Sequence, residues 1–149
     1  MINEEIYEQL KNNKITELDL KYNQIENIDK LSKYLFFNSS LTELNLYYNK
    51  IKNIDKLSES IKFNYSLKVL ILSFNKIDNI DKLGEYLKYN SSLKILGLSW
   101  NKIENINKLS ESLKTNSSLK KLYLYGNKIK KEDIIKLKEN NKNINLYYY

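Results

Sequence analysis

The positions of apolar and polar residues repeat along almost the whole chain. The clearest copy runs from Leu67 to Ile77, with leucines at its first, fourth and sixth positions, an asparagine at the ninth and an isoleucine at the eleventh. The same pattern begins at residues 15, 41, 93 and 119, with an isoleucine in place of the first leucine in the earliest copy. Its asparagines are spaced 26 residues apart: Asn23, Asn49, Asn75, Asn101 and Asn127. A fixed period of this length predicts a solenoid, in which each turn buries its apolar edge against its neighbours.

Each repeat contains the pattern of a strand followed by that of a helix. In the third copy, residues 68–73 alternate between apolar and variable positions, which predicts a short strand with Leu70 and Leu72 facing the interior. The apolar residues that follow are spaced three, three and four positions apart, which is the helical period: Ile77, Ile80, Leu83 and Leu87. The ninth asparagine falls at the turn that leaves the strand. We expect its buried amide to bond to backbone groups of its own and neighbouring turns.

Further asparagines flank each predicted helix. Asn79 and Asp81 suit the N-cap and first turn of the third helix. Asn90 follows its last turn, and asparagine tolerates the left-handed conformation that ends many helices, so we expect a C-cap there. The same position recurs as Asn38, Asn64 and Asn116. All four begin Asn-X-Ser sequons, but their regular spacing favours a structural role over glycosylation.

The two ends of the chain depart from the repeat. Residues 2–12 carry Ile2, Ile6 and Leu10 between charged positions, which predicts an amphipathic helix that caps the first turn. A last helix is expected over residues 131–140, with Ile134, Ile135 and Leu137 facing inward. The chain therefore divides as one domain, residues 1–149, made of a cap (1–14), five repeats of 25 to 26 residues (15–143) and a terminal half repeat (144–149).

The segments 87–93 and 113–119, which both read Leu-Lys-X-Asn-Ser-Ser-Leu, resemble the joint between helix and strand in leucine-rich repeats of the ribonuclease-inhibitor type. The resemblance covers residues 15–147. It implies an α/β fold, a right-handed horseshoe with a parallel concave sheet and convex helices. It also implies that the chain binds protein on its concave side.

Composition narrows the functional classes. The chain has no cysteine and no histidine, so it lacks a disulfide framework, a thiol nucleophile and the usual general base near neutral pH. We therefore expect no enzymatic activity, no metal and no cofactor. No apolar run approaches the roughly 18 residues that a membrane span needs, and the acidic start lacks the apolar core of a signal peptide. A cytoplasmic protein is expected.

The side chains that point outward from the predicted strands form a graded surface. It is acidic at the N-terminal end, apolar in the middle, and basic and aromatic at the C-terminal end. An exposed apolar patch rimmed by polar residues marks interaction sites, although β-branched residues also simply suit strands. We predict a protein-binding site made of Glu17, Asp19, Glu43, Tyr47, Val69, Ile71, Ile95, Trp100, Lys121, Tyr123 and Tyr125.

The eighth repeat position holds a column of aromatic residues along the rim of the predicted sheet: Tyr22, Tyr48, Phe74 and Trp100, followed by Gly126. Aromatic residues are frequent at interface hot spots, but a column can also stack on itself and shield the asparagine turns. Glu17, Asp19 and Glu43 raise a similar question, since neighbouring carboxylates can do acid–base chemistry or bind a metal. No ligand set completes such a site, which favours a solvated acidic patch.

The sequence also allows two alternative partners, a single-stranded nucleic acid and a second copy of the chain. The net charge is +7, and many lysines crowd the final repeat near Tyr123, Tyr125 and residues 147–149, a combination that suits single-stranded nucleic acid. Against it, all 25 basic residues are lysine, and an AT-rich codon bias would also produce a lysine excess. The other alternative is weak self-association through the open edge of the sixth strand, which begins at Ile144. The mixed charges of the convex helices indicate a solvated face.

Overall fold

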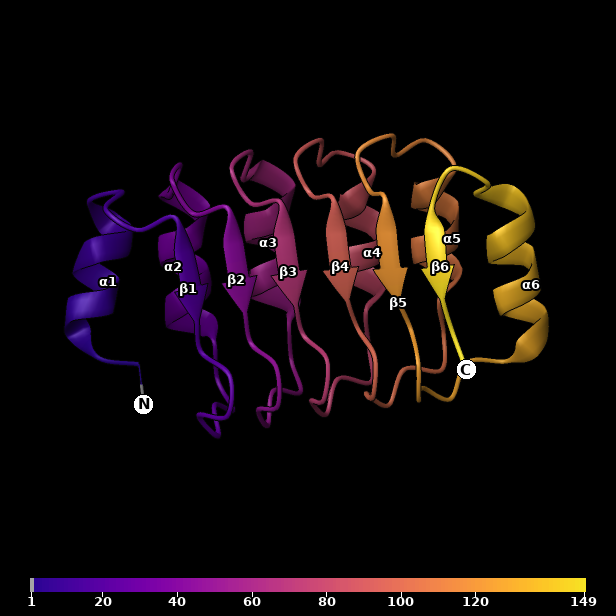
Figure 1. Cartoon of the computed structure of the whole chain (residues 1–149), viewed down its shortest axis with the longest axis horizontal. Helices are drawn as coiled ribbons and strands as arrows, with labels where there is room; N and C mark the ends of the chain where they lie inside the picture. Colours follow the sequence, from indigo (N-terminus) through magenta and orange to yellow (C-terminus); the bar gives the residue numbers. More distant parts are fainter. Residues whose placement is uncertain (1) are drawn as a thin grey trace.

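Helices and strands alternate strictly along the chain (Figure 1). The structure, a computed structural model, describes residues 2–149. Its helices are α1 (Glu4–Lys11), α2 (Asp29–Phe37), α3 (Asp55–Phe63), α4 (Asp81–Leu87), α5 (Asn107–Leu113) and α6 (Lys131–Asn140). Its strands are β1 (Glu17–Asp19), β2 (Glu43–Asn45), β3 (Val69–Ile71), β4 (Ile95–Gly97), β5 (Lys121–Tyr123) and β6 (Asn145–Tyr147).

The strands form one parallel sheet in chain order, with α2 to α5 stacked behind it (Figure 1). The register places equal repeat positions side by side, so that Leu18 pairs with Leu44 and Leu44 pairs with Leu70. One row of leucines therefore runs through the interior from turn to turn. The predicted α/β solenoid is confirmed. We call the outer side of the sheet the strand face and the outer side of the helices the helix face.

The helical positions predicted to face inward are buried, as Leu31, Leu57, Leu83 and Leu109 illustrate, each with at most 1% of its surface exposed. One residue of α6 was predicted wrongly, because Ile135 is 44% exposed. Its neighbours Ile134 and Leu137 share the buried side of α6. Each helical residue turns about 100° from the one before it, so Ile135 points away from that side.

The asparagines of the ninth position form the expected ladder. Asn75 accepts a hydrogen bond from the backbone N–H of Ile51 at 2.9 Å and donates to the backbone oxygens of Leu46 and Leu72 at 3.0 and 3.1 Å. Leu46 and Ile51 belong to the preceding turn, so each amide joins two turns. Asn23 has no such turn before it and remains exposed.

A second ladder runs along the ends of the helices, where the sequence suggested C-caps. Asn38 and Asn64 are the C-caps of α2 and α3, but their backbones are extended and not left-handed as expected. The prediction was wrong for Asn90 and Asn116, because Lys88 and Lys114 are the C-caps of α4 and α5 and neither asparagine has a positive φ. Each side chain is instead turned into the preceding turn and donates to its backbone. Asn90 Nδ2 donates to the oxygens of Ile61 and Asn64 at 2.7 and 2.9 Å.

The same side chain also holds the approach to the next strand. Asn90 Oδ1 accepts from the N–H groups of Ser92 and Leu93 at 3.1 and 2.9 Å. The sequons are therefore part of the solenoid interior, since Asn90 is only 4% exposed and its amide nitrogen is fully engaged.

The start of each central helix differs slightly from the sequence prediction. The N-cap of α4 is Ile80, whose side chain makes no cap bond. Asn79 lies one position earlier and accepts from the N–H of Asp81 at 2.8 Å, while Asp81 occupies the first turn as expected. Asparagine thus stabilises the turn that leads into the helix and does not cap the helix itself.

Helix α1 closes the first turn of the stack. Asn3 caps it by accepting from the N–H of Ile6 at 3.0 Å, and Leu10 is fully buried. Tyr7 is also buried, and its ring stacks on Tyr34 of α2 at 5.1 Å. The apolar side of α1 thereby covers the end of the core, where no preceding repeat lies in the described chain.

Candidate functional site

The strand face carries eight of the eleven predicted binding residues in two rows that cross the sheet. The register aligns Glu17, Glu43, Val69, Ile95 and Lys121 in the first row. A second row aligns Asp19, Asn45, Ile71, Gly97 and Tyr123. Since neighbouring parallel strands are about 4.8 Å apart, each row forms a continuous surface.

The apolar side chains in the middle of the strand face protrude less into solvent than the sequence suggested. Val69, Ile71 and Ile95 are only partly exposed. Gly97 contributes to this, because Ile71 leans over it: a Cβ at Gly97 would lie 3.2 Å from Ile71 Cδ1. The patch is therefore shallow and apolar, and the protruding apolar side chains lie elsewhere.

The most prominent of them form the aromatic column on the rim. Tyr22, Tyr48 and Trp100 are 61%, 54% and 54% exposed. Successive ring centroids of Tyr22, Tyr48, Phe74 and Trp100 are 5.1, 6.0 and 5.5 Å apart. Phe74 and Trp100 stack, the other neighbouring pairs are tilted against each other, and Tyr22, Tyr48 and Trp100 still expose about half of their surface or more.

The column depends on an unusual backbone conformation that sequence reasoning missed. Tyr22, Tyr48, Phe74 and Trp100 all have left-handed φ angles, between +54° and +59°. For a bulky residue this backbone conformation is less favourable than the right-handed one by roughly 1 kcal/mol or more. Gly126 takes the same position with φ of +63°, and a Cβ there would lie 2.5 Å from the Trp100 ring. Trp100 therefore ends the column by lying over a glycine.

Tyr47 joins the column to the strand face. It follows β2, and its ring lies 5.6 Å from that of Tyr22 and 5.1 Å from that of Phe74. Loss of contact with water among these rings raises the pKa of its hydroxyl, and the charge of Tyr22 adds to the effect. The predicted residues Tyr47 and Trp100 thus belong to one aromatic surface.

At the acidic end of the strand face, Glu17 and Asp19 are exposed and Glu43 is partly exposed. Asp19 forms an ion pair with Lys21, with 2.9 Å between Oδ2 and Nζ. Glu43 lies beside Glu17 in the register, at the same end of the sheet. In the part of the chain that the structure describes, no three histidine, cysteine or acidic side chains are grouped to hold a metal ion.

The ion pair at Asp19 makes a first prediction. The hydrogen bond from the Lys21 side chain lowers the pKa of Asp19, and the backbone N–H of Lys21 adds to this by donating to Asp19 Oδ1 at 3.1 Å. In Lys21→Ala, we expect the Asp19 pKa to rise but to stay below its usual value, because the backbone donor remains. Carboxyl-carbon NMR titration measures it. Lys52→Ala, which breaks the separate pair with Asp78, is the control. An unchanged Asp19 titration in Lys21→Ala would show that the pair does not persist in solution.

The C-terminal end of the strand face is aromatic, as predicted. Tyr123 stacks on Tyr147 of β6, with ring centroids 4.4 Å apart and planes 8° apart. Tyr125 is linked to the preceding repeat, because its backbone N–H donates to Ser99 Oγ at 3.1 Å. Lys121 lies beside them, partly exposed.

Comparison with known proteins agrees with this geometry. A family model described as a leucine rich repeat matches residues 11–28, 37–54 and 89–106. The chain carries leucine-rich repeats, and they build a leucine-rich-repeat solenoid. No curated protein sequence matches it.

Solved structures with similar folds span nearly all of this leucine-rich-repeat chain. Internalin C2 from Listeria monocytogenes matches with a TM-score of 0.70 and 24% identity, over 97% of this chain and 56% of its own. Actin-binding site 2 of leiomodin-1 matches with a TM-score of 0.64 and 20% identity, over 100% of this chain and 80% of its own. At these identities the likeness concerns the fold. Within residues 2–149, no helix is long and apolar enough to cross a membrane.

Sequence reasoning missed a second aromatic group, on the helix face of the leucine-rich repeats. Phe37, Phe63 and Tyr89 end or follow α2, α3 and α4 and are 76%, 48% and 51% exposed. They are also 26 residues apart, so the repeat itself carried the signal. The sequence prediction for the helix face rests on its charges alone, and some of these form ion pairs between turns, such as Lys56 with Asp29.

The two alternative partners stay predictions. The lysines predicted to contact a nucleic-acid strand are spread from just before β5 to just after α6: Lys120, Lys121, Lys128, Lys130, Lys131, Lys136, Lys138 and Lys142. Lys128 also pairs with Glu104. Strand β6 pairs only with β5 and ends the described sheet, which leaves the edge on which self-association would depend.

Proposed function

We propose that this leucine-rich-repeat chain is a non-catalytic module that binds a protein ligand on its strand face and aromatic rim. The observation that carries the proposal is the joined aromatic surface. Tyr22, Tyr48 and Trp100 are more than half exposed, and Tyr47 connects their column to the strand face. Aromatic residues with exposed edges dominate the energetics of many protein interfaces.

In this proposal, the ends of the strand face orient the ligand. Glu17, Asp19 and Glu43 supply negative charge at one end, while Lys121, Tyr123 and Tyr125 supply positive charge and aromatic contacts at the other. The shallow patch of Val69, Ile71 and Ile95 lies between them. The solved neighbour from leiomodin-1 is named as an actin-binding site, and a protein ligand fits that shared fold. The expected cytoplasmic location, and the division into one domain with a cap, five repeats and a terminal half repeat, belong to the same proposal.

The proposal is tested by affinity capture from cell extract with the wild type and with Val69→Lys/Ile95→Lys. Two lysines in the middle of the strand face would leave charges facing an apolar contact, so the main protein ligand should be lost. Circular dichroism checks that the variant folds. Ser91→Lys/Thr115→Lys adds the same charge at exposed positions away from the strands, and should capture like the wild type.

The rim is tested on the ligand thus identified. Trp100 is the single tryptophan, so its fluorescence reports on the rim directly. Binding should shift its emission to shorter wavelength, and Trp100→Gly should weaken affinity about tenfold or more. Glycine is the right replacement because it accepts the φ of +57° found there. Equal capture by wild type and Val69→Lys/Ile95→Lys, or RNA as the main captured species, would overturn the strand-face proposal.

A further inference from the structure

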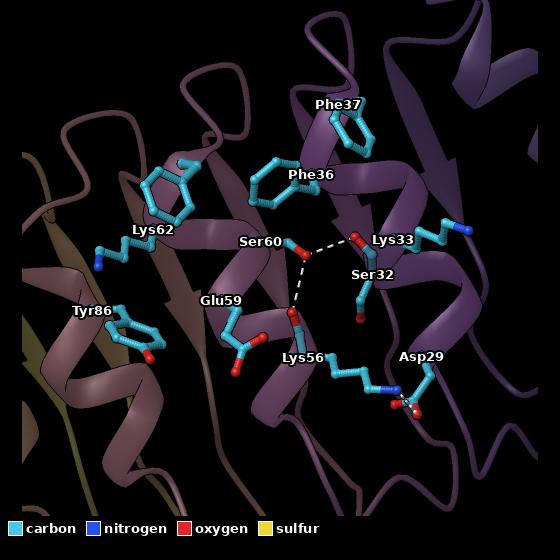
Figure 2. Close-up of a pocket in the computed structure, with 11 residues that line it drawn as sticks. Asp29, Ser32, Lys33, Phe36, Phe37, Lys56, Glu59, Ser60, Lys62 and Tyr86 are labelled. Atoms are coloured by element: carbon cyan, nitrogen blue, oxygen red, sulfur yellow. Dashed lines mark hydrogen bonds and ion pairs between the residues drawn. The ribbon is translucent and has the colours of Figure 1, made fainter.

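A groove opens on the helix face, opposite the surface just described. Figure 2 shows it between the neighbouring helices α2 and α3 and reaching Tyr86 of α4, with the strands behind. Its volume is about 580 Å³, which is within the usual range of binding sites for small groups or side chains. Phe36, Phe37 and Phe63 line its apolar end.

The groove lies beside Ser60, a small residue whose repeat stands between two repeats that carry tyrosine at the same position. Tyr34, Ser60 and Tyr86 occupy the same repeat position, 26 residues apart. Ser60 is buried, and its hydroxyl donates to the backbone oxygen of Ser32 at 2.6 Å, which ties α3 to α2 at the floor (Figure 2). A tyrosine there would fill the space between the two helices.

The apolar wall is exposed and already ordered. Phe36 packs against Phe37 at 4.9 Å and against Phe63 at 5.4 Å. Phe37 is nevertheless 76% exposed, the largest exposed fraction of any phenylalanine here. Large aromatic side chains that are exposed around a groove indicate an interaction site, because a ligand that buries them removes apolar surface from water.

The ammonium group of Lys62 lies among three aromatic rings at the edge of the groove. Lys62 Nζ lies 5.0 Å from the ring centroid of Phe63, 5.0 Å from that of Tyr86 and 4.9 Å from that of Tyr89. Cation–π contacts of this kind hold a lysine in place while leaving it able to meet an anion.

The charges around the groove are unbalanced in favour of lysine. Its two acidic residues are already paired, Asp29 with Lys56 and Glu59 with Lys82. Lys33 and Lys62 also line the groove, and neither has a carboxylate within ion-pair distance among residues 2–149. An approaching ligand therefore meets an apolar wall flanked by unpaired positive charge.

We propose that this groove binds a short acidic peptide segment that carries a large apolar side chain. The apolar side chain enters beside Phe36, Phe37 and Phe63, and a neighbouring carboxylate pairs with Lys62. This site is separate from the strand face, so it stands or falls independently of the function proposed above. It gives the protein a second docking surface and lets it hold two partners at once.

The test is selection of random 12-residue peptides, displayed on phage, against the full chain. The selected peptides should be acidic and contain phenylalanine, leucine or tryptophan. Ser60→Tyr should weaken their binding at least tenfold by filling the groove, and Lys62→Glu should do the same by reversing the charge. Affinities are measured by fluorescence anisotropy with the synthetic peptide.

Matched controls lie two repeats further along. Ser112 and Lys114 occupy the positions of Ser60 and Lys62 in α5 and its C-cap, outside the groove. Ser112→Tyr and Lys114→Glu should therefore bind the peptide like the wild type. If Ser60→Tyr does not fold, Lys62→Glu and Phe37→Ser, both at positions that solvent reaches, decide the question.

Amide NMR spectra locate the peptide on the chain. Shifts confined to α2, α3 and α4 are expected. Selection of basic or charge-free peptides, failure to select any peptide, undiminished binding by Lys62→Glu and Phe37→Ser, or shifts on the strand face would each overturn the proposal. Concentration-dependent self-association that Lys62→Glu abolishes would also overturn it, since the occupant would then be a second copy of the chain.

Discussion

Replacing Asn90 by glycine should lower the free energy of unfolding by about 4 kcal/mol, measured by urea denaturation, because four buried hydrogen bonds to backbone groups are lost. The amide of Asn90 donates to Ile61 and Asn64 and accepts from Ser92 and Leu93. At 4% exposure, water does not replace these bonds. Each bond also joins the third turn to the second or fixes the start of the next strand, so the loss acts on the interface between turns, on which solenoid stability depends.

Asn13→Gly is the matched control. Asn13 has a left-handed φ of +53°, is exposed and accepts a single hydrogen bond, from the N–H of Ser39 at 2.8 Å. Glycine suits this conformation, so the change in stability should stay within about 1 kcal/mol. A C-cap role for Asn90 would give the reverse outcome for Asn90→Gly, with stability unchanged or increased. That result would show that the second ladder does not form.

The sequence could not separate these two roles of asparagine. An asparagine after a helix is compatible with a left-handed cap and equally with a side chain that reaches the next turn. The choice depends on whether a backbone carbonyl of the preceding turn lies within reach, which is a property of the stack. For the ninth position the sequence did suffice, because Asn75 follows a strand and must be buried there.

The fold itself was predictable because the same apolar and asparagine pattern occurs five times along the chain. A single repeat would leave a strand–helix pattern open to several architectures, whereas regular spacing forces equal positions to stack, as Leu18, Leu44 and Leu70 do. The error at Ile135 arose where this support ends. Within the described residues α6 packs against one neighbouring helix, α5, so its buried side is defined by that helix alone.

The candidate binding surfaces were predictable only in part. Strand alternation correctly placed Val69 and Ile95 side by side on the strand face, but it could not show how far they protrude. It also gave no sign that Phe74 and Trp100 adopt left-handed backbones. The groove on the helix face lies beside Ser60, whose contrast with the tyrosines of the neighbouring repeats is one that a search for what repeats overlooks.

Gly84→Ala should lower the free energy of unfolding by about 2 kcal/mol, against the rule that alanine stabilises helices. A Cβ at Gly84 would lie 2.5 Å from the backbone nitrogen of Leu109 and 2.8 Å from the carbonyl carbon of Lys108. Both atoms belong to the backbone of α5, so no side-chain rotation relieves the contact. Overpacking of this kind costs about 3 kcal/mol, and the better helix propensity of alanine returns about 1 kcal/mol.

The equivalent position in α3 provides the comparison. Ser58 already has a Cβ there, and its hydroxyl bonds only to Ile54 of its own helix at 2.7 Å. Ser58→Ala should therefore change stability by less than about 1 kcal/mol. Urea denaturation of both variants shows whether helix propensity or packing between α4 and α5 has the larger effect at residue 84. If Gly84→Ala proves more stable than the wild type, helix propensity outweighs packing and α4 and α5 lie further apart in solution. If it is destabilised as expected, the close approach of these two helices is a fixed feature of the solenoid, and Gly84 is what allows it.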